Sequence, residues 1–527
     1  MYDIIVRDGT VVDGTGNVGY RAHVAIARDT VQVLRGDISS LPRAITVDAS
    51  HCIVAPGFID AHTHSDLVVL SEPRNEAKIR QGVTTEMIGL DGLGYAPLSR
   101  RNLEMMLTYW SGVNGYPSLD YNWSSVSEYL ERYYHTTAGN VVYFVPQNCL
   151  RAETVGWGDR PATKDEIRAM QDMLKQGMAE GAVGLSSALT YAPGIYASTD
   201  ELVELCRTVA ECGGVYATHV RYDLGDGAFD GFREAVAVAE KSGCPTHISH
   251  YTTNLVTRGQ AGKLLEIVDH ARARGIDLTF DAYPWDIGST SLHTPIPSWA
   301  HEGGPYALIE RLKDRAERER MRGQGSKLGG TVERLVVSGV KTGANKWCEG
   351  LTVAVIAERL SKDPWDVVCD LLVEEELQAS YCAFTGDMDD VKTLMMHPAH
   401  MFITDGIRIG GKPNPRACGT YPKILGQLVR DEGVMSLEQA VRKMTSFPAQ
   451  RHGLSDRGIL RDGMKADIVV FDPDTVSCTA TVAHPTEPPI GIEYVFVNGE
   501  MVLDGGRHTG ALSGEPLRHA SFPHSMC

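Results

Sequence analysis

The fold of this chain is decided by the stretch Ile53-Val54-Ala55-Pro56-Gly57-Phe58-Ile59-Asp60-Ala61-His62-Thr63-His64. Its apolar first part predicts a buried strand, and its polar end predicts where that strand stops. Residues i and i+2 of a strand point to the same face, so we expect the side chains of His62 and His64 to lie side by side. Two imidazoles on one face suit a borderline divalent cation such as zinc. Taken alone, the His-x-His pattern also fits two ordinary histidines in a polar loop.

Seven further strand candidates follow this stretch, with helical patterns between them. The pairs Thr163/Glu166, Ser198/Glu201 and Ser436/Gln439 predict capping boxes, which satisfy the unpaired N–H groups at a helix start. Strands that alternate with helices predict an α/β chain with a parallel sheet, and eight of them favour a closed (β/α)8 TIM barrel. An open doubly wound sheet is the structural alternative. The eight strand candidates are residues 57–61, 83–88, 141–146, 183–186, 215–218, 246–249, 278–282 and 401–404.

Both ends of the chain have all-β patterns, with Asp-Gly or Asn-Gly turns between β-branched runs. This indicates a small β-sandwich formed by both termini. The stretch between the last two barrel strands is far longer than one crossover and is rich in Gly, Pro and charge, which predicts an inserted subdomain over the barrel mouth. The expected divisions are 1–55 and 453–527 for the β-sandwich and tail, 56–284 and 351–452 for the barrel, and 285–350 for the inserted subdomain.

Three more side chains stand at the ends of predicted barrel strands. His219 and His250 each close a strand candidate, and 31 residues separate them, about the length of one βα unit. Asp405 ends the eighth strand, where a carboxylate can ligate a metal and accept a proton from water, although an Asp-Gly pair alone indicates only a turn. Active sites of such barrels lie at this rim, so the set predicts a metal-dependent active site. By strand alternation His247 is expected to be packed or hydrogen-bonded and not a ligand.

The composition excludes several other classes of protein. The chain has 527 residues, of which 43% are hydrophobic and 22% charged, and these fractions are those of a globular protein. Its formal net charge of -17 makes nucleic acid and anionic membranes unfavourable partners. Eleven scattered cysteines, no signal-peptide pattern and no apolar run long enough to cross a bilayer indicate a reduced, cytoplasmic protein. The oligomeric state stays open.

The chain resembles the amidohydrolase superfamily and, within it, the N-acyl-D-amino-acid deacylases (D-aminoacylases). The resemblance covers nearly the whole chain and implies a metal-containing (β/α)8 barrel with a β-sandwich from both termini and a small insertion. It rests on the order and spacing of several motifs. They are Pro56-Gly57-Phe58-Ile59-Asp60-Ala61-His62-Thr63-His64, Gly82-Val83-Thr84-Thr85, Gly181-Ala182-Val183-Gly184-Leu185-Ser186, Tyr216-Ala217-Thr218-His219-Val220-Arg221, Ile248-Ser249-His250, Asp281-Ala282-Tyr283-Pro284, Pro415-Arg416-Ala417-Cys418-Gly419-Thr420-Tyr421-Pro422 and Gly463-Met464-Lys465-Ala466-Asp467.

Three positions depart from the family pattern. Asp91 stands where the family commonly has a metal-binding Cys, and Thr252 stands where it tends to have a Lys. The run Gln147-Asn148-Cys149 replaces a Gly-His-Gly stretch. The fourth strand has neither the Lys nor the Glu that bridges two metals in other superfamily members, so a carbamate bridge is not expected.

The resemblance implies an enzyme that hydrolyses the N-acyl amide bond of a small molecule, with Asp405 as general base and acid. His62, His64, Asp91, His219, His250 and Asp405 are the expected ligands of one or two divalent ions, with zinc expected and manganese or cobalt as alternatives. Arg416 is expected to bind the substrate carboxylate, and Tyr191, Thr252, Tyr283 and Ser289 are expected to line the substrate site. Two alternatives are open: hydrolysis of another amide, carbamoyl or cyclic imide substrate without a free α-carboxylate, and a non-catalytic scaffold such as some relatives of dihydropyrimidinase became.

Overall fold

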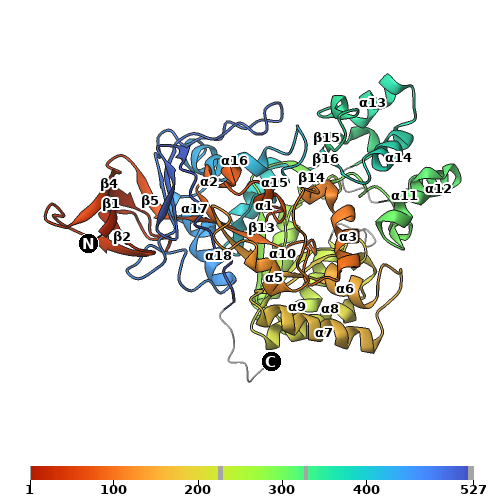
Figure 1. Ribbon diagram of the computed structural model, residues 1–527, viewed down its shortest axis with the longest axis horizontal. Helices are drawn as coiled ribbons and strands as arrows, with labels where there is room; N and C mark the ends of the chain where they lie inside the picture. The colour runs from red at the N-terminus through yellow and green to blue at the C-terminus, as the bar shows by residue number, and fades with distance from the viewer. Residues whose placement is uncertain (1, 223–228, 326–329, 520–527) are drawn as a thin grey trace.

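The computed structural model describes residues 2–222, 229–325 and 330–519, and it has an α/β fold (Figure 1). Parallel strands lie at its centre, and two groups of mainly antiparallel strands lie on either side of them. Residues 326–329 of the expected inserted subdomain and 520–527 of the expected tail lie outside the described residues. The limits of the domains stay a prediction.

One nine-stranded sheet contains strands from both ends of the chain. β5 pairs antiparallel with β18, with Val54 opposite Val470, and this pair joins the two ends. The red N-terminal strands and the dark blue C-terminal strands lie side by side in Figure 1. The prediction that both termini build one β unit is confirmed, whereas its description as a sandwich stays a prediction. The strands are β1 (Tyr2–Val11), β2 (Tyr20–Ala27), β3 (Thr30–Leu34), β4 (Arg43–Asp48), β5 (Ile53–Pro56), β18 (Ile468–Phe471), β19 (Ile492–Val497), β20 (Glu500–Asp504) and β21 (Arg507–His508).

The central strands form two parallel sheets, in the orders β6-β7-β8 and β9-β10-β11-β12-β13-β17. Only Phe144 separates β8 from β9, so one run of chain belongs to both sheets. At the other side a parallel bridge joins Thr63, just after β6, to Gly406, just after β17. Each of the eight predicted strands is present within a few residues of its expected place. The strands are β6 (Phe58–Asp60), β7 (Val83–Ile88), β8 (Asn140–Tyr143), β9 (Val145–Pro146), β10 (Gly184–Ala188), β11 (Val215–His219), β12 (Thr246–Ile248), β13 (Leu278–Ala282) and β17 (His400–Phe402).

Three helices begin where the capping pairs predict. α7 (Lys164–Ala179) and α17 (Leu437–Met444) start with complete capping boxes. At α8 (Thr199–Glu211) only half of the box forms: Ser198 Oγ accepts from Glu201 N at 3.1 Å. The Glu201 carboxylate instead pairs with the buried guanidinium of Arg151, because a buried cation needs a compensating charge. Among the described residues, no helix is long and apolar enough to span a membrane.

A fourth sheet, of three antiparallel strands, lies between β13 and β17 in the sequence. Its order is β14-β16-β15, with β14 (Ile287–Ser291), β15 (Val336–Val340) and β16 (Ala379–Phe384). Helices α11 (Pro305–Lys313), α12 (Arg315–Met321), α13 (Val353–Leu360) and α14 (Pro364–Glu374) accompany it at the right of Figure 1. β14 and β16 supply side chains to the wall of the pocket described below.

Candidate metal centre

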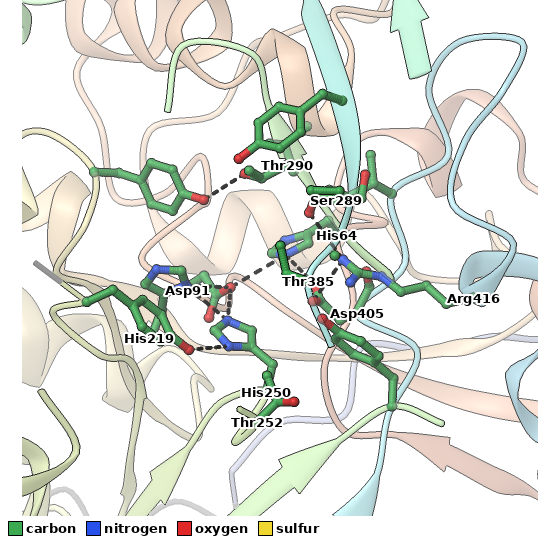
Figure 2. A pocket seen from close by; sticks show the side chains of 18 of the residues that line it. His64, Asp91, His219, His250, Thr252, Ser289, Thr290, Thr385, Asp405 and Arg416 are labelled. Carbon is green, nitrogen blue, oxygen red and sulfur yellow. Dashed lines mark hydrogen bonds and ion pairs between the residues drawn. The ribbon is translucent and has the colours of Figure 1, made fainter. Parts of the chain in front are cut away.

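All six residues expected as ligands lie at or just beyond the carboxyl ends of central strands. The carboxyl ends of parallel strands meet at one edge of a sheet, so residues far apart in the sequence come together there. Figure 2 shows Asp91 and His250 between His219 on one side and Asp405 on the other. His62 and His64 follow β6, Asp91 follows β7, His219 ends β11, His250 follows β12 and Asp405 follows β17.

The first group of possible ligands consists of His62, His64, Asp91 and Asp405, all buried. His64 Nε2 lies 3.1 Å from Asp405 Oδ1, and His62 Nε2 lies 3.3 Å from Asp91 Oδ2. One ligand atom from each residue falls within 4.8 Å of the others, which is compact enough for one ion.

The second group consists of Asp91, His219 and His250. His219 Nδ1 lies 2.9 Å from His250 Nε2, and His250 Nε2 lies 3.1 Å from Asp91 Oδ2. Asp91 Oδ2 is therefore shared: it lies within 3.6 Å of a ring nitrogen of each of the four histidines. Two adjacent cation sites with Asp91 between them follow from this geometry.

The donor set suits a divalent cation. Asp91 Oδ1 and His62 Nε2, which faces Asp91 Oδ2, are buried and make no hydrogen bond to any residue that the structure describes. Nearly all buried polar groups in folded proteins have a partner, so these atoms indicate a partner of another kind. Imidazole nitrogen and carboxylate oxygen are the donors of zinc sites and also admit manganese or cobalt. The residues form a buried His/Asp metal site of the binuclear type.

The electrostatics keep both carboxylates of the site ionised. Burial raises the pKa of Asp91, but the charges of His62 and His250 outweigh burial and hold that pKa well below its usual range. Burial also raises the pKa of Asp405, and the Arg416 guanidinium outweighs it, so this pKa is lowered too. An ionised carboxylate is the form that ligates a metal and accepts a proton.

Three of the six residues have left-handed backbone conformations. The φ angles are 52° at Asp91, 33° at His250 and 46° at Asp405. Such angles are unfavourable for residues other than glycine and persist only where the surrounding structure imposes them. Strain of this kind concentrates at functional sites, and these three residues belong to the candidate metal centre.

Asp281 holds two of the histidines from behind, a role that the sequence analysis missed. Its Oδ1 accepts from the backbone N of His250, and its Oδ2 lies 3.4 Å from His62 Nδ1. His247 Nε2 hydrogen-bonds to Asp281 Oδ2 at 2.8 Å and its Nδ1 to Thr279 Oγ1 at 2.8 Å, which confirms that His247 is bonded within the core. Carboxylates that orient metal-binding histidines in this way are common around such sites. The motif that contains Asp281 was the signal that could have indicated it.

A fully buried lysine ties the strands beneath the site together. Lys78 Nζ donates to Thr63 Oγ1 at 2.8 Å and to Thr404 Oγ1 at 2.7 Å, and it pairs with Asp60. Thr404 directly precedes Asp405 in the chain. Sequence reasoning missed Lys78 because it lies on α2 (Glu76–Ile79), outside every strand that carries a ligand.

The pocket beside the ligands contains all the residues expected at the substrate site. Arg416 is 1% exposed, and its Nη2 lies 2.8 Å from Asp405 Oδ2; both side chains are labelled in Figure 2. Its guanidinium lies 4.3 Å from the centre of the Tyr283 ring. Arg416 Nη1 and Ser289 Oγ are buried and have no hydrogen-bond partner among the described residues. Tyr191 and Thr252 also line this pocket.

The chain is similar in sequence and in fold to known proteins. The Amidohydrolase family matches residues 46–503. A D-aminoacylase of Alcaligenes xylosoxydans xylosoxydans is 33% identical, with 98% of this chain and 97% of the relative covered. An N-acyl-D-aspartate deacylase of the same organism is 30% identical, with 97% and 93% covered. A crystal structure of N-acyl-D-glutamate deacylase from Bordetella bronchiseptica, complexed with zinc and a phosphonate inhibitor that mimics the tetrahedral intermediate, is 30% identical, with 98% and 99% covered and a TM-score of 0.83.

Proposed function

We infer the reaction of this chain from the family to which it belongs, the D-aminoacylase family of the amidohydrolases. The chain is a hydrolase of carbon–nitrogen bonds other than peptide bonds, with a buried His/Asp metal site. Because the chain belongs to a family of enzymes, the alternative of a non-catalytic scaffold no longer applies. We propose that its substrate is an N-acyl-D-amino acid and that water cleaves the N-acyl amide. The observation that carries this proposal is the position of Asp91 Oδ2 within 3.6 Å of four imidazoles, beside Asp405 and Arg416.

The six ligand residues would hold one or two divalent ions, and zinc, which the glutamate deacylase structure contains, is the proposed one. An ion held there lowers the pKa of bound water to about 7 and polarises a carbonyl group. Asp91 gives oxygen where the family commonly has sulfur. Exchange of a soft donor for a hard one lessens the preference for zinc, so manganese and cobalt should also support activity.

Asp405 is the proposed general base and acid. It would accept the proton of the attacking water and return it to the leaving nitrogen. Its lowered pKa keeps it ionised at neutral pH, and Arg416 and His64 bind its two oxygens and fix its orientation.

Arg416 would also bind the α-carboxylate of the substrate. Its Nη1 and the hydroxyl of Ser289 are buried donors without a hydrogen-bond partner among the described residues, and a carboxylate would satisfy both. Thr252 is neutral where the family tends to have Lys, so binding would be weaker than with two cations. Arg416 is ion-paired with Asp405, and Thr252 carries no charge, so little positive charge is left for a substrate carboxylate. These two features favour a second candidate substrate, an amide or cyclic imide without a free α-carboxylate.

We also propose that the two parallel sheets close into one (β/α)8 barrel with the metal site at its carboxyl end. The bridge between Thr63 and Gly406 supports closure, as do the hydrogen bonds from Asp405 N to His62 O at 2.9 Å and from His64 N to Gly406 O at 3.2 Å. The cytoplasmic localisation stays a prediction.

A substrate screen tests the reaction. The metal-depleted protein, reloaded with zinc, manganese or cobalt, would be assayed with N-acyl-D- and N-acyl-L-amino acids and with cyclic imides. Metal-dependent hydrolysis of an N-acyl-D-amino acid is the expected result. Turnover of cyclic imides alone would favour the second candidate, and turnover that needs no metal would overturn both.

A further inference from the structure

Tyr222 lies beside the metal ligands, although it was not among the residues expected at the site. It is three residues after His219, and it lines the same pocket as Thr252 and Arg416. Its hydroxyl oxygen lies 3.1 Å from His250 Nδ1. Its ring meets the His219 ring edge-on, with 5.0 Å between the ring centres. The phenol therefore contacts two of the candidate ligands and also faces the pocket.

The direction of the hydrogen bond between Tyr222 and His250 follows from the other nitrogen of the imidazole. His250 Nε2 faces Asp91 Oδ2 at 3.1 Å, so this nitrogen is the one placed to ligate an ion. A neutral imidazole that ligates through Nε2 carries its proton on Nδ1. A protonated His250 also carries a proton on Nδ1. In both states Nδ1–H donates and the oxygen of Tyr222 accepts.

The phenol hydrogen of Tyr222 is then left to donate elsewhere. Among the residues that the structure describes, His250 is the one hydrogen-bond partner of this hydroxyl. A phenol has an ordinary pKa of about 10, so the hydroxyl carries its hydrogen at neutral pH. A buried donor that faces a pocket and has no acceptor among the described residues indicates an acceptor on a ligand.

We propose that Tyr222 binds an oxygen of the substrate through its O–H and, through its oxygen, fixes His250 in the state that ligates the metal. The first part rests on the proposed function, because it takes the substrate to be an N-acyl compound with carbonyl and carboxylate oxygens. In Figure 2 His219 and His250 lie on one side of the pocket and Arg416 lies on the other. Tyr222 thus gives the substrate a second anchor, opposite Arg416. It is a neutral donor on the side of the pocket where this chain has Thr252 and the family tends to have a lysine.

The positioning role is tested by metal binding, without substrate. Tyr222→Phe keeps the ring and removes the acceptor, and Tyr251→Phe is the matched control. Tyr251 follows His250 in the chain, but its hydroxyl donates to the backbone of Leu264 at 2.7 Å. Competition of the metal-depleted proteins with a chelator for zinc should show affinity about 10- to 100-fold weaker in Tyr222→Phe and unchanged in Tyr251→Phe. Equal zinc affinity in Tyr222→Phe and the wild type would overturn this role.

The substrate-binding role is tested at saturating metal with the best N-acyl substrate of the wild type. Loss of one neutral hydrogen bond should raise KM about threefold to tenfold in Tyr222→Phe and leave kcat within about twofold. An unchanged KM would overturn the role. Failure of the proposed function is a separate result, because the wild type itself would then hydrolyse no N-acyl substrate, while the chelator experiment would still report on His250.

Discussion

Arg416 donates twice to Asp405: its Nη2 lies 2.8 Å from Oδ2 of the carboxylate, and its Nε donates to the backbone oxygen at 2.7 Å. The residue expected to bind the substrate carboxylate is thus bound to the residue expected to move the proton. Only Nη1 remains without a hydrogen-bond partner within the described part of the chain. Substrate binding and catalysis are therefore expected to depend on the same guanidinium.

We predict that Arg416→Ala lowers kcat as well as raising KM. A hydrogen bond to a charged group contributes about 1.5–3 kcal/mol, so each parameter should change roughly tenfold to a hundredfold. Arg416→Lys, which keeps the charge but not the paired donors, should lie between the wild type and Arg416→Ala. Steady-state kinetics on an N-acyl-D-amino acid measures both parameters. A raised KM with an unchanged kcat would show that the contact with Asp405 has no part in turnover.

For Asp91 we predict a change in metal content. Because Asp91 Oδ2 is shared by both groups of ligands, Asp91→Ala should weaken binding at both sites. Asp91→Cys should restore a soft donor and raise the preference for zinc over manganese. Metal analysis after dialysis against equal concentrations of the two ions makes the comparison. Wild-type stoichiometry in Asp91→Ala would exclude Asp91 as a ligand.

Thr252→Lys is expected to improve binding of substrates that carry an α-carboxylate. The new ammonium would add a second cation to the pocket, and KM should fall about tenfold or more. Thr252→Met is the control, because methionine is similar in length to lysine but carries no charge. If both variants bind the substrate equally well, the effect comes from packing and the carboxylate does not reach this side of the pocket.

We predict that the protein loses stability against unfolding in acid because His293 is fully buried. Burial, with a smaller contribution from His301, lowers the pKa of His293 to about 3. Between this value and the unfolded value of about 6.5 the unfolded chain binds more protons, so stability falls as pH decreases through that window. His293→Gln cannot titrate, and its Tm should fall less between pH 7 and pH 5 than the wild-type Tm. Parallel falls in Tm would show that His293 does not contribute.

The sequence predicted those structural features that depend on short-range patterns of residues along the chain. Alternating strands and helices predicted the parallel α/β core, and the side chains at strand ends that were expected to ligate a metal are those that the structure brings together. It could not predict contacts that depend on tertiary packing. The tie between Arg416 and Asp405 and the contact of Tyr222 with His250 arise only when separate loops meet over the strand ends. The half-formed capping box at Ser198 shows the same limit, because buried Arg151 takes the carboxylate of Glu201.

The proposed role of Asp405 is tested most directly by the ratio of kcat for Asp405→Asn to kcat for the wild type, on an N-acyl-D-amino acid at saturating metal. Asparagine keeps the shape of the side chain but cannot accept the proton of water. General acid–base catalysis contributes about 10²- to 10⁴-fold, so kcat should fall by at least about a hundredfold while the protein stays folded. A kcat for Asp405→Asn close to that of the wild type would contradict this role.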